Sequence, residues 1–194
     1  MTFQSLLKKL IIPTSIFLGI TFFGSGMAKL YFEHKYFGWI GPVWLEDKLT
    51  PYGLGLYARF IAYSQVIIGY LLLTLRFRTL GSVMVIPLIA NILMVTISLQ
   101  WQGTPFVVGI LLMMALFLIY SDRKKLFPLI GIASDYQPND PWSWKANLIW
   151  ILGLFLNLAS IQISSFNLLF AWSVSIIGIG FSFGSHFVEK DSSN

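Results

Sequence analysis

The chain has 194 residues, of which 56% are hydrophobic and 11% charged, and its mean hydropathy is +0.75. Soluble domains carry about 25% charged residues, so this composition excludes an ordinary soluble protein and leaves room for one membrane domain. There is no cysteine, which excludes thiol–disulfide chemistry, Fe–S ligation and thiolate zinc sites. Because there are two histidines, we expect no metal or haem site built from several histidines.

The first long uncharged run covers residues 10–28 and follows two lysines. This outline resembles a signal peptide, but the run is as long as a membrane span, so we expect a spanning helix. Gly19 and Gly26 share one face of that helix with Lys29 and Glu33. The pattern predicts a packing seam of small residues that ends in two charges four residues apart.

Residues 31–50 are dense in aromatic and charged side chains, a composition typical of the membrane–water interface. We expect this segment to cover one end of the helices. At its end, Thr50 and Pro51 predict the N-cap and the first residue of the second spanning helix.

The second span, residues 54–75, is long enough to cross a bilayer but contains Arg59 and Gln65. Polar groups in hydrocarbon cost free energy, so neighbouring helices or a cavity must cover them. The small residues on the face of Gln65 are Ala58, Ala62 and Gly69. Such a stripe is typical of a helix packed tightly against other helices.

Two further uncharged regions each predict a pair of spans. Residues 79–121 are broken at 100–105, and residues 146–185 fold back at 162–167. A polar connection, 122–145, separates the two pairs. The predicted fold is an all-α membrane bundle of six transmembrane helices.

The basic residues indicate the orientation of the six spans. One side of the membrane receives Lys8, Lys9, Arg76, Arg78, Arg123, Lys124, Lys125, Lys145 and Lys190. The other side receives four cations that three acids nearly balance. The positive-inside rule therefore predicts an inner-membrane protein with both termini in the cytoplasm. Because the cations flank apolar segments and form no solvated basic face, we expect no nucleic-acid partner.

Polar residues gather toward the predicted outer surface. The candidate ligand-binding residues there are Lys29, Glu33, His34, Arg59 and Gln100, with Glu46 and Asp47 nearby. One interpretation is a site for a polar head group, such as a quinone ring or an anionic solute; the other is a structural ion-pair network. In either case, we expect Arg59 to pair with a carboxylate of the loop.

A second polar set lies near the predicted midplane. The helical rise places Gln65, Asn91 and Asn157 at a common depth of roughly 16–18 Å. Amides of this kind usually hold helices together by hydrogen bonds, so we interpret them as structural. No residue is assigned a catalytic role.

Several of these segments resemble the DoxX family. The resemblance rests on residues 24–30 (GSGMAKL), on Gln65 followed by Gly69, on the turn 101–105, and on the Asp-Arg pair that begins at 122. It covers roughly residues 10–126. Where the family pattern has an acid, this chain has Gln65, which argues against proton transfer at that position.

The resemblance implies a four-helix bundle over residues 1–126, which leaves 127–194 as a linker and a C-terminal hairpin. DoxX-like proteins are small polytopic membrane proteins, many without an assigned activity. We expect a non-catalytic or accessory membrane subunit that binds a membrane or periplasmic protein, or a small lipophilic ligand, at its outer face. One branch of the family resembles the membrane subunit of a thiosulfate–quinone oxidoreductase. A quinone-linked oxidoreductase subunit, with quinone as cofactor, is therefore the enzyme alternative. The third candidate function is a small-solute transporter.

Overall fold

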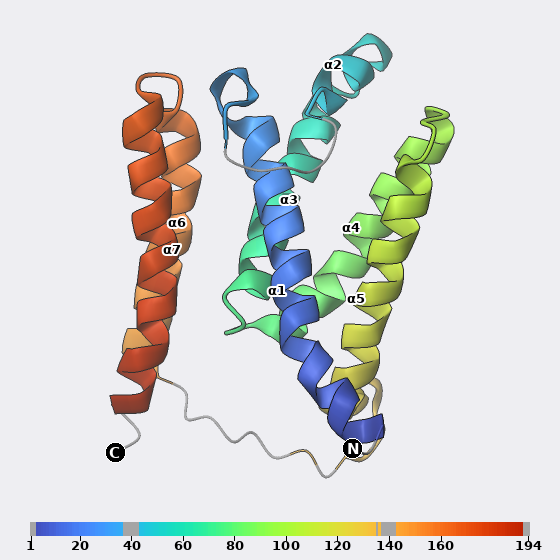
Figure 1. Cartoon of the computed structure of the whole chain (residues 1–194), viewed down its shortest axis with the longest axis vertical. Coiled ribbons are helices and arrows are strands. Elements are labelled where there is room, and N and C mark those ends of the chain that lie inside the picture. The colour runs from blue at the N-terminus through green and yellow to red at the C-terminus, as the bar shows by residue number, and fades with distance from the viewer. Residues whose placement is uncertain (1–2, 37–42, 135, 137–142, 192–194) are drawn as a thin grey trace.

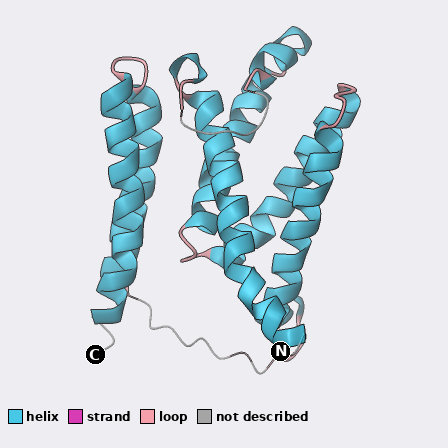
Figure 2. Cartoon of the chain, in the orientation of Figure 1, coloured by secondary structure: helices cyan, strands magenta, loops and turns pink. Residues whose placement is uncertain are grey.

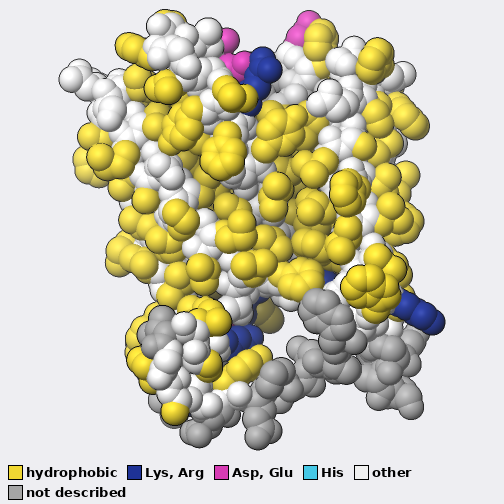
Figure 3. Space-filling model, turned by 180° about the vertical axis from the view of Figure 1, so that it is seen from behind, with side chains coloured by type: hydrophobic (Ala, Val, Ile, Leu, Met, Phe, Trp, Pro, Cys, Tyr) yellow, Lys and Arg dark blue, Asp and Glu magenta, His cyan; other side chains and the backbone are white. Residues whose placement is uncertain are grey.

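The computed structural model describes residues 3–36, 43–134, 136 and 143–191, and every regular element in these ranges is a helix (Figure 1, Figure 2). The elements are α1 (Phe3–Leu30), η1 (Phe32–His34), α2 (Leu45–Leu49), η2 (Thr50–Tyr52), α3 (Gly55–Leu73), α4 (Arg78–Ser98), α5 (Thr104–Leu126), η3 (Phe127–Ile130), α6 (Trp144–Ile163) and α7 (Leu168–Asp191). Six of them are long and apolar enough to cross a membrane: α1, α3, α4, α5, α6 and α7. The predicted all-α bundle with six apolar helices is confirmed. Hydrophobic side chains cover its middle, and charged side chains gather toward its two ends (Figure 3).

The start of the second span differs from the prediction. Thr50 and Pro51 begin the short helix η2, not α3. The Thr50 hydroxyl donates back to the Glu46 carbonyl oxygen at 2.7 Å, so it stabilises the end of α2. Gly53 then adopts a left-handed conformation with φ 73°, which ends η2 before α3 begins at Gly55. The part of this loop at 37–42 lies outside the described residues.

The helices α1 and α3 pack closely against each other, and glycines allow it. A Cβ atom placed on Gly26 would lie 2.7 Å from the Ala62 carbonyl oxygen. One placed on Gly69 would lie 2.7 Å from Cα of Phe23. The small-residue stripes predicted on both helices therefore face each other and bring the two backbones together.

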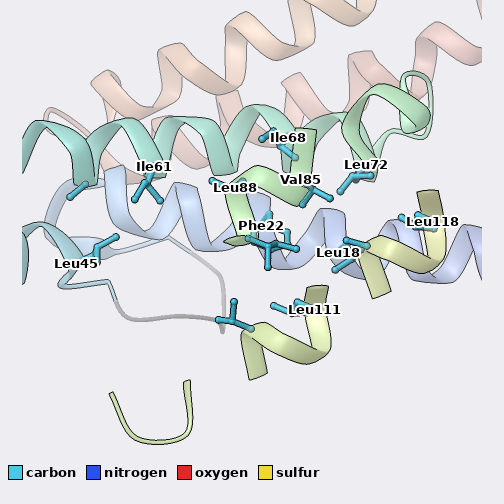
Figure 4. Close-up of a cluster of buried hydrophobic side chains, with 14 of the residues drawn as sticks. Leu18, Phe22, Leu45, Ile61, Ile68, Leu72, Val85, Leu88, Leu111 and Leu118 are labelled. Atoms are coloured by element: carbon cyan, nitrogen blue, oxygen red, sulfur yellow. The ribbon is translucent and has the colours of Figure 1, made fainter. Parts of the chain in front are cut away.

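The pair α4–α5 packs against α1 and α3 to complete the N-terminal four-helix unit. Leu18, Phe22, Ile68, Leu72, Val85 and Leu118 are among the side chains of its buried cluster (Figure 4). In Figure 1, α4 and α5 approach α1 near the N-terminus and diverge from it toward the end that carries α2. The helices are therefore closely packed at one end of the unit and separated at the other.

Tyrosine–serine contacts join the C-terminal hairpin, α6–α7, to the segment that follows α1. The Tyr31 hydroxyl donates to Ser160 Oγ at 2.7 Å, and the Tyr36 hydroxyl lies 3.1 Å from Ser175 Oγ. Burial raises the pKa of Tyr36 above its ordinary value, so this phenol keeps its proton. Each tyrosine ring packs beside a serine of the hairpin, and its hydroxyl group hydrogen-bonds to that serine.

Both termini lie at the same end of the molecule (Figure 1). We expect a fluorescent reporter inserted at Gly131 to indicate the cytoplasm, because the basic cluster 123–125 lies in that connection. A reporter fused after Asn194 should give the same signal, because an even number of spans places the C-terminus on the same side. A phosphatase that folds only outside the cytoplasm should be active when inserted beside Asp47. Phosphatase activity after Asn194, or a cytoplasmic signal beside Asp47, would contradict the orientation.

Candidate functional site

A mostly apolar cavity of about 280 Å³ lies where α1 and α3 face α4 and α5. It occupies the half of the four-helix unit in which these pairs diverge (Figure 1). Its apolar wall includes Phe22, Leu45, Ile61, Val95, Trp101 and Leu111. Phe22, Leu45, Ile61 and Leu111 come from four different helices and are drawn in Figure 4. We call this space the Lys29 cavity, after the charged residue in its wall.

Three polar residues of α1 lie along this cavity. Thr21, Ser25 and Lys29 are spaced four residues apart, which places them on one face of the helix. Lys29 is half-buried, and its Nζ donates to Ser25 Oγ at 2.6 Å and to the Ser25 carbonyl oxygen at 3.2 Å. Within the described residues, no carboxylate lies within ion-pair distance of Lys29. The ammonium group therefore has neutral partners only, and its charge remains uncompensated.

Two other polar atoms in the cavity wall are buried without a partner. Gln65 is 4% exposed and Thr21 is 3% exposed. Neither Gln65 Oε1 nor Thr21 Oγ1 makes a hydrogen bond to any described residue. A buried polar atom left unpaired costs about 1–3 kcal/mol, so both atoms favour a polar group in the cavity. Because the Gln65 oxygen is almost fully buried, a bound molecule with a hydroxyl or amine donor would satisfy it only after the side chain turns toward the cavity.

The five candidate residues of the outer surface are only partly brought together. Lys29 and Arg59 line a second pocket of about 280 Å³ between the four-helix unit and the hairpin. Glu33 forms an ion pair with Lys35 and none with Lys29, four residues before it. His34 Nδ1 lies 3.1 Å from the Ala28 carbonyl oxygen. Gln100 is exposed after α4. Glu33, His34 and Gln100 line neither pocket.

The expected partner of Arg59 is present. Its Nε donates to Glu46 Oε1 at 2.7 Å. Both side chains are well hydrated, with exposed fractions of 62% for Arg59 and 38% for Glu46. The pair joins α3 to α2 at the surface, where an ion pair contributes about 0–1 kcal/mol to stability.

The three midplane amides have different surroundings. Asn91 is exposed and accepts a hydrogen bond from the Tyr57 hydroxyl of α3 at 3.2 Å. Asn157 is fully buried and accepts one from Ser175 of α7 at 2.8 Å. Both bonds join neighbouring helices. Gln65 differs, because it lines the Lys29 cavity and its buried oxygen has no hydrogen-bond partner among the described residues.

The sequence reasoning missed Thr21 and Ser25 as cavity residues. Their signal was available, since both precede Lys29 by multiples of four within an apolar helix. It also missed Asp122, which follows an uncharged span and begins a basic run. Asp122 is 4% exposed, and its Oδ1 lies 2.5 Å from Arg78 Nη2. This buried pair joins the start of α4 to the end of α5.

No family model, curated protein or solved structure matches this chain.

Proposed function

We propose that this protein is a DoxX-like accessory subunit of the inner membrane that binds a small lipophilic ligand near its outer face. The observation that supports the proposal is the Lys29 cavity, a largely apolar space with an uncompensated ammonium group and two unpaired polar atoms. Apolar pockets with a few converging polar groups are typical small-molecule sites. The six apolar helices suit an integral membrane protein, and the positive-inside rule favours cytoplasmic termini.

The walls of the cavity define the ligand that would fit. A volume of about 280 Å³ lies just below the usual range of ligand pockets, about 300–1,000 Å³, so the buried part of the ligand is small. Lys29 offers a hydrogen-bond donor, and Gln65 offers an amide that can donate and accept. The ligand should therefore carry at least one oxygen acceptor on an otherwise apolar body.

A quinone-linked oxidoreductase subunit is the second candidate function. Quinone carbonyl oxygens accept hydrogen bonds, which the Lys29 ammonium and the Gln65 NH2 group would donate from α1 and α3. The unpaired Gln65 oxygen would need a hydroxyl of the reduced quinol. The chain has no cysteine, so no thiol of its own can pass electrons to the quinone, and in this candidate function a partner protein supplies them. In this role, the chain holds the quinone, and the partner contains the redox centre.

The proposal predicts that a lipophilic molecule co-purifies with the protein. We expect mass spectrometry of the gently solubilised protein to find such a molecule in the wild type. Lys29→Met and Gln65→Leu should each reduce the retained amount about tenfold, because each removes a polar contact worth about 1–2 kcal/mol. Comparing quinones with other lipids in the extract distinguishes the two candidate functions.

The matched controls are Lys48→Met and Gln102→Leu, which make the same chemical changes at exposed positions outside the cavity. Both should retain the ligand like the wild type. If neither Lys29→Met nor Gln65→Leu lowers retention while both proteins stay folded, the cavity is not the binding site.

A further inference from the structure

A different hollow lies at the end of the molecule that carries the termini, where α3 turns into α4. Its volume is about 550 Å³, and its walls come from α1, the α3–α4 turn, α5 and the segment after η3. Figure 3 shows a hollow at this end, bordered in part by Lys and Arg side chains. We call this space the basic hollow. It shares no lining residue with the Lys29 cavity.

Three cations line the basic hollow: Arg76 of the α3–α4 turn, Arg78 at the start of α4 and Lys125 of α5. The buried Asp122 carboxylate holds Arg78 at 2.5 Å and accepts a hydrogen bond from Thr79 Oγ1 at 3.0 Å. Lys125 Nζ lies 4.0 Å from the same carboxylate, at the limit of an ion pair. Asp122 is thus engaged mainly by the start of α4. Among the described residues, the Lys125 ammonium makes only long contacts, 4.0 Å to this carboxylate and 5.5 Å to the centroid of the Tyr136 ring, so it can bind another anion in addition.

The backbone adds positive potential at the same place. Residues Phe77 to Leu80, at the start of α4, form part of the wall. Phe77, the N-cap residue, makes no side-chain capping bond, and the first turn of α4 contains no acid. A helix N-terminus carries about half a positive charge, which repels Arg76 and Arg78 and attracts anions. The Asp122 carboxylate already offsets part of this positive charge, and Arg76 Nε donates to Asn147 Oδ1 at 2.9 Å. An anion bound in the hollow would add to this compensation.

The basic hollow also borders the apolar part of the molecule. Ile12 of α1 and Leu80 of α4 line it, and both side chains are exposed. Both residues also belong to the membrane-spanning segments that begin at Lys9 and Arg78. The cations therefore lie at the level where a bilayer changes from head groups to acyl chains, and basic pockets at this level suit lipid phosphates.

We propose that the basic hollow binds a phosphate-bearing anion. Guanidinium groups and an ammonium group complement phosphate oxygens in charge and in hydrogen bonding. An anionic lipid could supply the phosphate, with its chains against Ile12 and Leu80, and so could free phosphate from solution. The two sources share the same head-group chemistry but differ in their need for the apolar border.

The test uses the full-length protein in detergent micelles. Its unfolding temperature is measured during titration with phosphatidylglycerol, with phosphatidylcholine, or with sodium phosphate against sodium chloride at equal ionic strength. We expect phosphatidylglycerol to stabilise the protein and phosphatidylcholine not to do so. Lys125→Gln should raise the midpoint of the titration about fivefold, the effect of losing one favourable charge.

The matched control is Lys124→Gln, which makes the same change at the neighbouring exposed lysine outside the hollow. Its midpoint should stay within about twofold of the wild type, because a diffuse surface charge contributes less than a site contact. Stabilisation by sodium phosphate with the same dependence on Lys125 would identify free phosphate as the source. Equal effects of the two lysine variants, or no stabilisation by either phosphate source, would overturn the proposal.

Discussion

Replacing Gly69 by alanine will lower the free energy of unfolding by about 3 kcal/mol, the upper part of the usual range for overpacking. The added Cβ would lie 2.7 Å from Cα of Phe23 and 2.9 Å from the carbonyl carbon of Phe22. These are backbone atoms of α1, so no side chain can rotate away to relieve the contact. The two helices must separate, which loosens the whole seam that Gly26 extends.

Gly109→Ala is the matched control for this prediction. A Cβ on Gly109, within α5, has no atom within 4 Å, and alanine favours a helix over glycine. We expect this variant to change stability by less than about 1 kcal/mol. Unfolding of both variants can be followed in detergent by circular dichroism during heating or SDS titration. If Gly69→Ala were as mild as Gly109→Ala, the close approach of α1 and α3 would be wrong.

The spanning helices and the α1–α3 seam could be predicted because both depend on local pattern. Long uncharged runs determine the six spans, since a charge within hydrocarbon is costly. The glycine spacing determines the seam, because small residues at one helical face allow close packing. For Gly26 and Gly69, the structure shows the contacts that these spacings indicate.

The Lys29 cavity could not be predicted in the same way. It exists because α4 and α5 diverge from α1 and α3 toward one end, and the divergence depends on the packing of four helices (Figure 1). The sequence indicated Lys29 as a candidate, but the apolar wall residues are ordinary within their own segments, and Gln65 has the same appearance as a structural amide. Only the tertiary arrangement shows that its oxygen lacks a partner.

The two arginine–carboxylate pairs differ in the same way: one could be predicted from the sequence, and the other could not. The sequence indicated a carboxylate partner for Arg59, because the acids of the preceding loop were close in the chain. The partner is Glu46, but the pair is exposed. The buried pair, Arg78 with Asp122, joins residues 44 positions apart, which local spacing cannot reveal.

Replacing Asp122 by alanine should therefore cost about 3 kcal/mol, far more than loss of the Arg59 pair. The Asp122 side chain is 4% exposed and Arg78 is 18% exposed, so removal of the carboxylate leaves a largely buried guanidinium without its partner. Thr79 Oγ1 loses its acceptor in the same variant. Glu46→Ala is the matched control, and it should cost at most about 1 kcal/mol, because water can replace its contact with Arg59.

The double variant shows whether the buried pair itself is responsible. Asp122→Ala leaves the Arg78 guanidinium without its carboxylate, and Arg78→Ala leaves the buried Asp122 carboxylate with only Thr79 and the more distant Lys125. The double variant removes both charges of the closest pair. Its loss of stability should consequently be smaller than the sum of the two single losses by about 1–3 kcal/mol, the coupling expected of residues in direct contact. Thermal unfolding of the three variants in one detergent measures this coupling. Strict additivity would show that Arg78 and Asp122 act independently, which the 2.5 Å contact between them does not allow.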